Sequence, residues 1–219
     1  MAALHKPFGL MYKLYHYFRS SSSYRVRIAL NLKKLPCQFH PIDLRVGEQL
    51  TPEYERINQQ HIVPTLITPA GVALNQSLAI IEYLEERYPT PALLPIQPEL
   101  RAQIRAFACA LACEIHPINN LRVLNYLKKT LHQSEPAVNA WYQHWVNLTL
   151  IPLEKISRLT SGHYTFGDSV SLADIVLIPQ IYNARRYQVD MTPFPTLNRI
   201  EQNCLMLDSF QKAHPDRFA

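Results

Sequence analysis

Up to residue 88 the chain mixes short segments of alternating apolar and polar residues with segments of helical periodicity. Tyr12–Tyr17 alternates aromatic, aliphatic and polar types, which is typical of a strand. Pro69-Ala70-Gly71 forms a turn between two apolar runs, which predicts a hairpin. In chain order the pattern predicts a strand over 12–17, a helix over 25–34, a strand over 38–44, a short helix over 51–58, strands over 63–67 and 72–75, and a helix capped by Ser77.

This order of elements predicts a thioredoxin-like α/β domain over residues 11–88. A strand–helix–strand unit followed by a strand–strand–helix unit gives a mixed sheet of that kind. Prolines crowd residues 89–97, so this segment cannot continue a helix and is predicted to be a linker. No strand pattern follows, and residues 98–219 are predicted to form an all-α domain. Its helices are expected over 99–132, 136–160, 171–187 and 195–210.

A helix-start motif stands at the beginning of the third of these helical segments. Ser171 and Asp174 have the spacing of a capping box. In such a box the serine accepts a hydrogen bond from the backbone of the third helical residue, whose carboxylate reaches back to the serine. We therefore assign this pair to folding and not to catalysis.

Composition limits the classes of function. Hydrophobic residues make up 47% and charged residues 18%, which suits a chain that buries a full core. No apolar run reaches the roughly 18 residues of a membrane span, and Met1–Leu10 lacks the apolar stretch of a signal peptide. Met11 offers a second start, so we interpret the first ten residues as a leading extension. The net charge of +5 is scattered, without the aromatic–basic alternation of a nucleic-acid surface. We expect a cytoplasmic protein that binds neither membranes nor nucleic acid and can bind a small anion.

The four cysteines do not have the spacing of a disulfide framework. Cys109 and Cys113 are four residues apart in a helical stretch and so share one face. We interpret them as small buried apolar side chains, in preference to a metal site completed by His116. No metal is expected.

A run of four serines, Ser20–Ser23, precedes the first predicted helix. A thiol is an effective nucleophile only as the thiolate, and its ordinary pKa of about 8.5 leaves it mostly protonated near neutral pH. A helix N-terminus together with a hydroxyl donor would favour the anion. The serine run can supply both, and it can also be read as an extended N-cap without chemistry.

Two further segments place polar backbone groups at the ends of predicted strands. Val63-Pro64 stands at the entry to a strand, where an ordinary trans peptide bond is the simpler alternative. Gln76-Ser77 stands at a strand-to-helix junction, where N–H groups and a hydroxyl can bind a carboxylate. A plain N-cap at Ser77 would be compatible with the same geometry.

Taken together, these motifs resemble the zeta class of glutathione transferases, which includes maleylacetoacetate isomerases and the closely similar maleylpyruvate isomerases. The resemblance runs from about Met11 to the C-terminus, in order and with matching spacing. Each motif alone is weak, and the combination is specific. The motifs that carry it are Ser20-Ser21-Ser22-Ser23-Tyr24-Arg25-Val26-Arg27-Ile28-Ala29-Leu30, Val63-Pro64-Thr65-Leu66, Gln76-Ser77-Leu78-Ala79-Ile80-Ile81-Glu82-Tyr83-Leu84-Glu85-Glu86, His116-Pro117-Ile118-Asn119-Asn120 and Val189-Asp190-Met191-Thr192-Pro193.

The resemblance implies a glutathione-dependent cis–trans isomerase acting on a small dicarboxylate, with glutathione as a cofactor that is not consumed. It also implies a cytoplasmic homodimer that takes part in aromatic amino acid catabolism. The catalytic candidates are Ser20, with Ser21 and Ser22 as helpers. The candidates for cofactor binding are Ser20, Ser21, Ser22, Ser23, Tyr24, Arg25, Gln49, Val63, Pro64, Gln76, Ser77, His116, Asn120, Leu121 and Arg122. The candidates for binding a substrate carboxylate are Arg25 and Arg186, with Arg185 a weaker one.

Several of these residues have simpler alternatives. Gln49 could be a surface glutamine, His116 a structural histidine and Arg186 a solvated arginine. The chain also departs from the family, because Ser22 stands where a cysteine is frequent and Tyr24 where a tryptophan is. No thiol of the protein's own is then expected at the site. The rival functions are a general glutathione transferase or dehalogenase acting on α-halo acids, and a transferase-like binding protein without catalysis.

Overall fold

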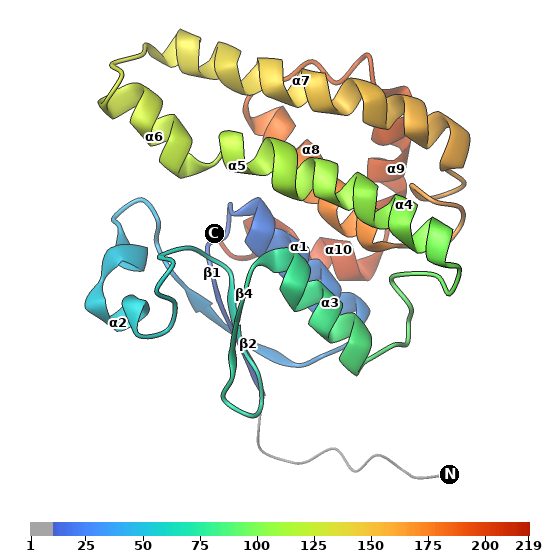
Figure 1. The fold of residues 1–219 in the computed structure, drawn as a ribbon, viewed down its shortest axis with the longest axis horizontal. Helices are drawn as coiled ribbons and strands as arrows, with labels where there is room; N and C mark the ends of the chain where they lie inside the picture. The colour runs from blue at the N-terminus through green and yellow to red at the C-terminus, as the bar shows by residue number, and fades with distance from the viewer. Residues whose placement is uncertain (1–10) are drawn as a thin grey trace. The chain divides into compact units, whose positions relative to one another are not determined.

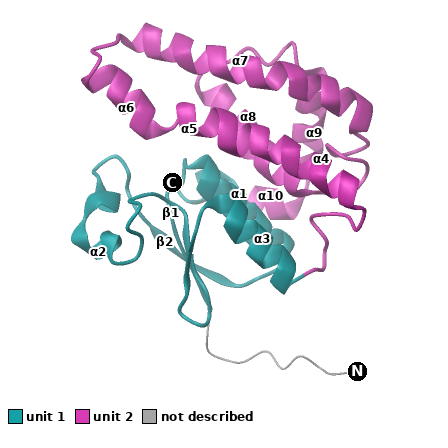
Figure 2. Cartoon of the chain, viewed as in Figure 1, with its two compact units in different colours: residues 1–88, 213–219 teal, residues 89–212 magenta. Residues whose placement is uncertain are grey.

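The computed structural model describes residues 11–219, so the interpretation of Met1–Leu10 as an extension lies outside the described residues. The chain divides into two compact units. The first, coloured teal in Figure 2, comprises the residues up to Tyr88 together with Ala213–Ala219. The second, coloured magenta, is Pro89–Lys212. The last seven residues thus belong to the first unit, whereas the sequence-based boundary ran the helical domain to residue 219.

The first unit is built on a four-stranded mixed sheet in the order β2-β1-β3-β4. Its strands are β1 (Tyr12–His16), β2 (Cys37–Pro41), β3 (Thr65–Ile67) and β4 (Ala73–Asn75). β1 pairs in parallel with β2 and antiparallel with β3, which forms the predicted hairpin with β4. The thioredoxin-like fold class is confirmed.

The helices of this unit are α1 (Ser21–Leu32), the short α2 (Pro52–Glu55) and α3 (Ser77–Arg87), with a 3-10 turn, η1 (Glu48–Leu50). α1 and α3 pack against each other (Figure 1). Apolar side chains from the sheet and from these two helices are buried together, among them Leu14, Ile28, Leu66, Ile80 and Leu84. This core fixes the start of α1 and the start of α3, where the candidate site residues lie.

The second unit is helical, apart from one isolated bridge between Ser161 and Gly167. α8 forms its buried centre, since most of its residues from Leu172 to Ile181 are almost fully covered. Its elements are α4 (Pro98–Cys109), a π-helical segment η2 (Ala110–Ile115), α5 (His116–Ile118), α6 (Leu121–Lys129), α7 (Glu135–Thr160), α8 (Leu172–Arg186), α9 (Pro195–Leu205) and α10 (Asp208–Ala213). A 3-10 turn, η3 (Pro215–Arg217), follows in the C-terminal segment of the first unit.

Two predicted helices are interrupted. The segment 99–132 breaks between α5 and α6, because Asn120 adopts an extended conformation and its side chain caps α6 through the Arg122 amide. The segment 195–210 breaks after Leu205, so α9 and α10 are separate helices. Periodicity continues across both breaks and so does not reveal them.

Two predictions about single residues are wrong. Ser77 is the first residue of α3 and not its cap; the cap position is Gln76, which has φ 68° and ψ 116°. Cys109 and Cys113 are exposed and not buried. Their positions at the junction of α4 and η2 lie on the outer side of a helix whose other face supplies the buried Phe107 and Leu111.

Buried carboxylates cap two helices of the second unit. The capping box at Ser171 is confirmed: the Asp174 carboxylate accepts hydrogen bonds from the Ser171 amide at 2.8 Å and from the Thr165 amide at 2.8 Å. Glu154 of α7 accepts from the amides of Thr196 and Leu197 at the start of α9, at 3.1 and 3.0 Å. Among residues 11–219, no helix has the length and apolar character needed to span a membrane.

Candidate active site

The serine run forms the turn between β1 and α1. Ser20 is the N-cap of α1, and its Oγ accepts a hydrogen bond from the Ser23 amide at 3.2 Å. The Oγ atoms of Ser20 and Ser22 are 2.9 Å apart, and Ser22 donates to the Val63 carbonyl at 3.1 Å. Because the single Ser22 proton is directed to Val63, the Ser20 proton must be the one shared between the two hydroxyls. Ser20 thus carries a donor that can turn from Ser22 to a ligand.

Burial separates the four serines into two pairs. Ser20 and Ser22 are partly exposed, whereas Ser21 is 2% exposed and Ser23 is fully buried. Ser23 Oγ accepts from the Tyr17 amide at 3.4 Å, which secures the turn. Ser20 and Ser22 are therefore partly accessible to solvent, whereas the side chains of Ser21 and Ser23 lie inside the fold.

Val63-Pro64 is a cis peptide bond at the entry to β3, in place of the ordinary trans bond. Both residues are buried, and the Val63 carbonyl faces the serine turn through its bond to Ser22. The two segments are 41 residues apart in sequence, and the fold brings them together at the carboxyl side of β1 and the entry to β3.

The junction between β4 and α3 forms a second polar cluster. Gln76 is exposed, with a positive φ of 68°, and its side-chain amide donates to Gln60 Oε1 at 3.1 Å. A left-handed conformation is unfavourable for a residue other than glycine and is found at ligand-binding positions more often than elsewhere. Ser77, the next residue, has its Oγ within 3.3 Å of Arg25 Nη1, which donates to it. Gln60 was not among the residues singled out by the sequence, which carries no pattern that would mark it.

Arg25 and Tyr24 are both buried. Arg25 is 1% exposed, and its guanidinium lies behind Ser77 and not on the surface. Its hydrogen bond to Ser77 makes it a positioning residue for that hydroxyl, and its role as a contact to a substrate carboxylate stays a prediction. The neighbouring Tyr24, also 1% exposed, belongs to the interior of the first unit.

Gln49 lies in η1 with an unusual side chain. Among residues 11–219 no group donates a hydrogen bond to its buried Oε1, although its backbone carbonyl is 3.0 Å from His61 Nδ1. A buried acceptor without a donor is costly, and it indicates a missing partner that carries an N–H group. Glutathione, the cofactor implied by the resemblance, is a tripeptide with such N–H groups, so this residue fits it.

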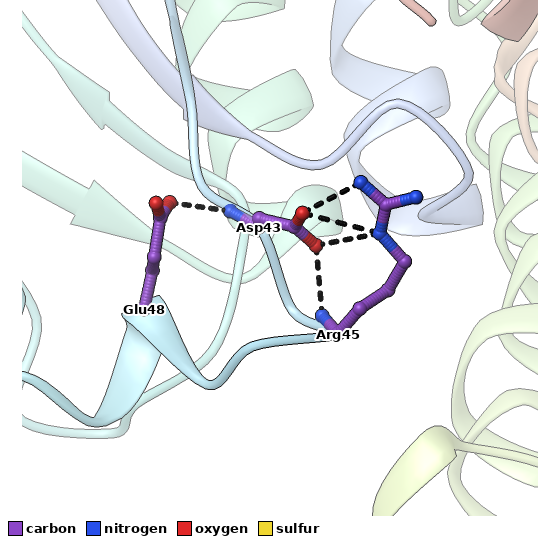
Figure 3. A network of polar contacts seen from close by, with 3 residues as sticks. All are labelled: Asp43, Arg45 and Glu48. Carbon is purple, nitrogen blue, oxygen red and sulfur yellow. Dashed lines mark hydrogen bonds and ion pairs between the residues drawn. The ribbon is translucent and has the colours of Figure 1, made fainter.

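The loop that carries Gln49 is held by a small polar network (Figure 3). The Asp43 carboxylate accepts from the amide and the guanidinium of Arg45, both at 2.9 Å, and Glu48 accepts from the Asp43 amide at 2.6 Å. Hydrogen bonds from Arg45 lower the pKa of Asp43. The network ties Asp43 to the first residue of η1, next to Gln49.

The remaining cofactor candidates lie in the second unit, at the junction of α5 and α6. Asn120 uses its side chain to cap α6, which gives it a structural role. Leu121 is 42% exposed and Arg122 is exposed, so both can be reached from solvent. His116 is half-buried at the start of α5. Nothing in these four side chains by itself distinguishes a ligand contact from a surface position.

The two arginines at the end of α8 have different partners. Arg185 forms an ion pair with Glu201 of α9, which raises its pKa. Arg186 is exposed and donates from Nη1 to the neutral Asn183 amide at 2.9 Å. Within residues 11–219 no carboxylate is paired with Arg186. Its charge is therefore available for an anion, whereas that of Arg185 is already neutralised.

Known proteins resemble this chain over most of its length. Residues 14–92 match the family model for the glutathione S-transferase N-terminal domain. The chain is 45% identical over 205 residues to the maleylpyruvate isomerase of Ralstonia sp, covering 93% of this chain and 96% of that protein.

Solved structures indicate the same family. The holo structure of a maleylpyruvate isomerase, a bacterial glutathione S-transferase of the zeta class, has a TM-score of 0.91 at 45% identity and covers 93% of this chain and 96% of that chain. The maleylacetoacetate isomerase of Anaeromyxobacter dehalogenans 2CP-1, with glutathione bound in its active site, has a TM-score of 0.86 at 39% identity, with 95% and 97% covered. The chain therefore belongs to the zeta class of glutathione transferases, the family of the maleylpyruvate and maleylacetoacetate isomerases.

Proposed function

We propose that this protein is a glutathione-dependent cis–trans isomerase of maleylpyruvate or maleylacetoacetate. The observation that carries the proposal is the Ser20 hydroxyl at the N-terminus of α1, whose proton is directed to Ser22 among the described residues. Glutathione, when bound, supplies the thiol whose reversible addition to the cis double bond allows that bond to rotate.

The first unit binds and orients the cofactor in this proposal. The backbone of Val63, beside the serine turn, takes the cysteinyl portion, and the Gln76–Ser77 junction takes the γ-glutamyl carboxylate at the start of α3. Arg25 keeps the Ser77 hydroxyl in place from behind. Gln49 offers its unpartnered Oε1 to an N–H group of the tripeptide.

Ser20 and Ser22 act on the thiol. Ser20 turns its proton from Ser22 to the sulfur, and the Ser22 hydroxyl can then turn its own proton from the Val63 carbonyl to the Ser20 oxygen. The oriented N–H groups of the first turn of α1 add a favourable field for the anion. Hydrogen bonding to the charged form lowers the pKa of a thiol, so the bound sulfur is ionised at a lower pH than free glutathione.

We assign substrate recognition to the second unit and, within it, to Arg186. A dicarboxylate needs a fixed cation, because burying a carboxylate without a partner is costly. The Arg186 guanidinium is free of carboxylate partners among the described residues and can bind a carboxylate through two parallel hydrogen bonds. His116, Asn120, Leu121 and Arg122 are retained as cofactor contacts in this proposal, on the family resemblance alone.

The finer expectations about the cell rest on the family as well. We propose a cytoplasmic homodimer that takes part in aromatic amino acid catabolism. The domain assignment follows the two units, with glutathione binding in the residues up to Tyr88 and substrate binding in the helices that follow.

Arg186→Ala tests the function together with its substrate class. Initial rates are measured on maleylpyruvate, maleylacetoacetate and an α-halo acid, each with and without glutathione. We expect glutathione-dependent turnover of one or both cis-diacids, and a loss of about 2 kcal/mol of transition-state stabilisation, or about thirtyfold in kcat/KM, in Arg186→Ala. The dissociation constant of glutathione should stay within about twofold of the wild-type value.

Arg185→Ala is the matched control, because it removes the same charge one residue away. It breaks the ion pair with Glu201 and should therefore lower stability more than it lowers turnover. If Arg185→Ala and Arg186→Ala lost kcat/KM equally, or if Arg186→Ala kept wild-type turnover, Arg186 would be removed from the proposal. Halide release from the α-halo acid without isomerisation of either diacid would replace the isomerase with a dehalogenase.

A further inference from the structure

The C-terminal segment of the chain returns to the first unit. Residues 213–219, which we call the C-terminal strap, cluster with the sheet and with α1 and α3, and not with the helices that precede them (Figure 2). The strap contains η3 and ends in Phe218 and Ala219. One side chain of α1, Arg27, donates a hydrogen bond to the strap.

Arg27 is fully buried and divides its donors between the strap and the serine turn. Its Nε donates to the Ala213 carbonyl at 2.9 Å, across 186 residues of sequence. Its Nη2 donates to the Phe18 carbonyl at 3.0 Å, and Nη1 lies 3.5 Å from the Tyr17 carbonyl. The guanidinium is planar and rigid, so it fixes these three carbonyls relative to one another.

Aromatic rings of the strap and the sheet close the space around this cation. The guanidinium carbon of Arg27 lies 4.7 Å from the centre of the Phe218 ring, a cation–π arrangement. Phe218 also packs edge-on against Phe39 and His16, with ring centres 4.9 and 5.2 Å apart. His16 accepts from Arg27 Nη1 through Nδ1 at 3.3 Å, which requires a neutral ring. Burial and the charge of Arg27 lower the pKa of His16 to about 3, in agreement with that role.

The two carbonyls held by Arg27 belong to the turn that ends at Ser20. The Ser20 amide donates to the Tyr17 carbonyl at 3.1 Å, and the Tyr17 amide donates to Ser23 Oγ at 3.4 Å. The position of the Ser20 hydroxyl therefore depends on a short turn whose carbonyls are tied, through one guanidinium, to the last residues of the chain. None of these groups needs to touch a ligand.

We propose that Arg27 and the C-terminal strap form a latch that positions the Ser20 hydroxyl for the thiol of glutathione. Arg27 is a positioning residue, and the aromatic ring of Phe218 keeps its guanidinium in place. The inference rests on the proposed function for its catalytic consequence, whereas its structural part concerns the serine turn alone. A latch of this kind makes catalysis depend on residues 213–219, which lie far from the serine turn in sequence.

The test uses three variants that disturb the latch, together with a matched control and a rescue variant. Phe218→Ala and a chain ending at Pro215 remove the ring, and both leave the Ala213 carbonyl as an ordinary amide. Arg27→Lys keeps the buried charge and removes the planar fork. Arg217→Ala is the matched control, because Arg217 is an exposed residue of the same strap. Phe218→Tyr, which keeps the ring face, serves as the rescue.

Two readouts are measured. The first is amide hydrogen exchange of residues 17–23 without glutathione, with the amides of α3 as an internal reference. We expect about tenfold faster exchange in residues 17–23 in Phe218→Ala and in the truncated chain, with α3 unchanged. The second is the pKa of the bound glutathione thiol together with kcat. The thiol pKa should rise and kcat should fall about tenfold, with the KM for glutathione within about twofold of wild type.

The outcomes separate the latch from the proposed function. Wild-type behaviour in Arg217→Ala and Phe218→Tyr, with the changes above in the other variants, supports the latch. The enzyme could also isomerise neither diacid and yet show faster exchange in residues 17–23 and a raised thiol pKa in these variants. That result would support the latch and reject the proposed function. The latch would be overturned if Phe218→Ala and the truncated chain left both the exchange of residues 17–23 and the thiol pKa unchanged. A fall in their melting temperatures would not alter that conclusion.

Discussion

At the scale of single residues, the direction of one hydroxyl proton decides the chemistry of the site. Ser20 both caps α1 and holds a proton that it shares with Ser22. The same side chain thus contributes to folding and to the ionisation of a thiol. The two contributions can be separated, because capping uses the lone pair of the oxygen and thiolate stabilisation uses the proton.

Ser20→Ala should affect both the stability of the fold and the ionisation of the bound thiol. Loss of a hydrogen bond to a charged group removes about 1.5–3 kcal/mol, so turnover should fall by about tenfold or more and the pKa of the bound thiol should rise. Loss of the cap should lower the free energy of unfolding by about 1 kcal/mol. Turnover, thiolate absorbance against pH and urea unfolding measure the three effects.

Ser134→Ala is the matched control, since Ser134 caps α7 through the Ala137 amide. It should lose similar stability without a change in the thiol pKa. If Ser20→Ala behaved in the same way as Ser134→Ala, the thiol would have to be stabilised by Ser22.

The sequence predicted that the serine run mattered, but not which serines face a ligand. That depends on the helix starting at Ser21, because a shift of one residue would exchange the buried and the exposed pair. The burial of Arg25 could not be predicted, because arginines are seldom fully buried and a surface position is the natural expectation. Only the packing of α1 against α3 shows that its guanidinium lies behind Ser77.

At the scale of elements, local motifs were predictable where the interacting residues are close in sequence. The capping box of α8 and the hairpin of β3 and β4 follow from patterns a few residues long, and both are present. The break between α5 and α6 was not predictable, because Asn120, which caps α6, is a residue type found inside helices as well as at their ends. The π-helical segment η2 likewise has no sequence signature.

Asp174 gives the sharpest test at this scale. Burial raises its pKa, although hydrogen bonds from Thr165 and Ser171 oppose that shift. Asp174→Ala should leave four buried donors of these two residues without an acceptor and lower the free energy of unfolding by about 3 kcal/mol or more. Chemical denaturation measures the loss.

Asp190→Ala is the control for this prediction. Its carboxylate accepts from the Thr192 amide on the exposed surface, so its removal should change stability by about 0.5 kcal/mol or less. Equal losses for the two aspartates would mean that the capping box does not stabilise α8 more than a surface turn stabilises its loop.

At the scale of the whole molecule, the sequence predicted two kinds of architecture in the right order. The strand patterns stop before the proline-rich segment, and the sheet of the described residues lies wholly in the first unit. The return of residues 213–219 to that unit could not be predicted, since the Arg27–Ala213 contact joins positions with no local relation. Long-range pairing of this kind leaves no periodic signal in a single sequence.

The central claim is that glutathione acts as a catalyst on a cis-diacid and is regenerated. The most direct measurement follows isomerisation by proton NMR with the enzyme and glutathione both far below the substrate concentration. The account predicts many trans products for each glutathione, with the tripeptide recovered unmodified. Product limited to one equivalent of glutathione, or a stable glutathione conjugate, would contradict it.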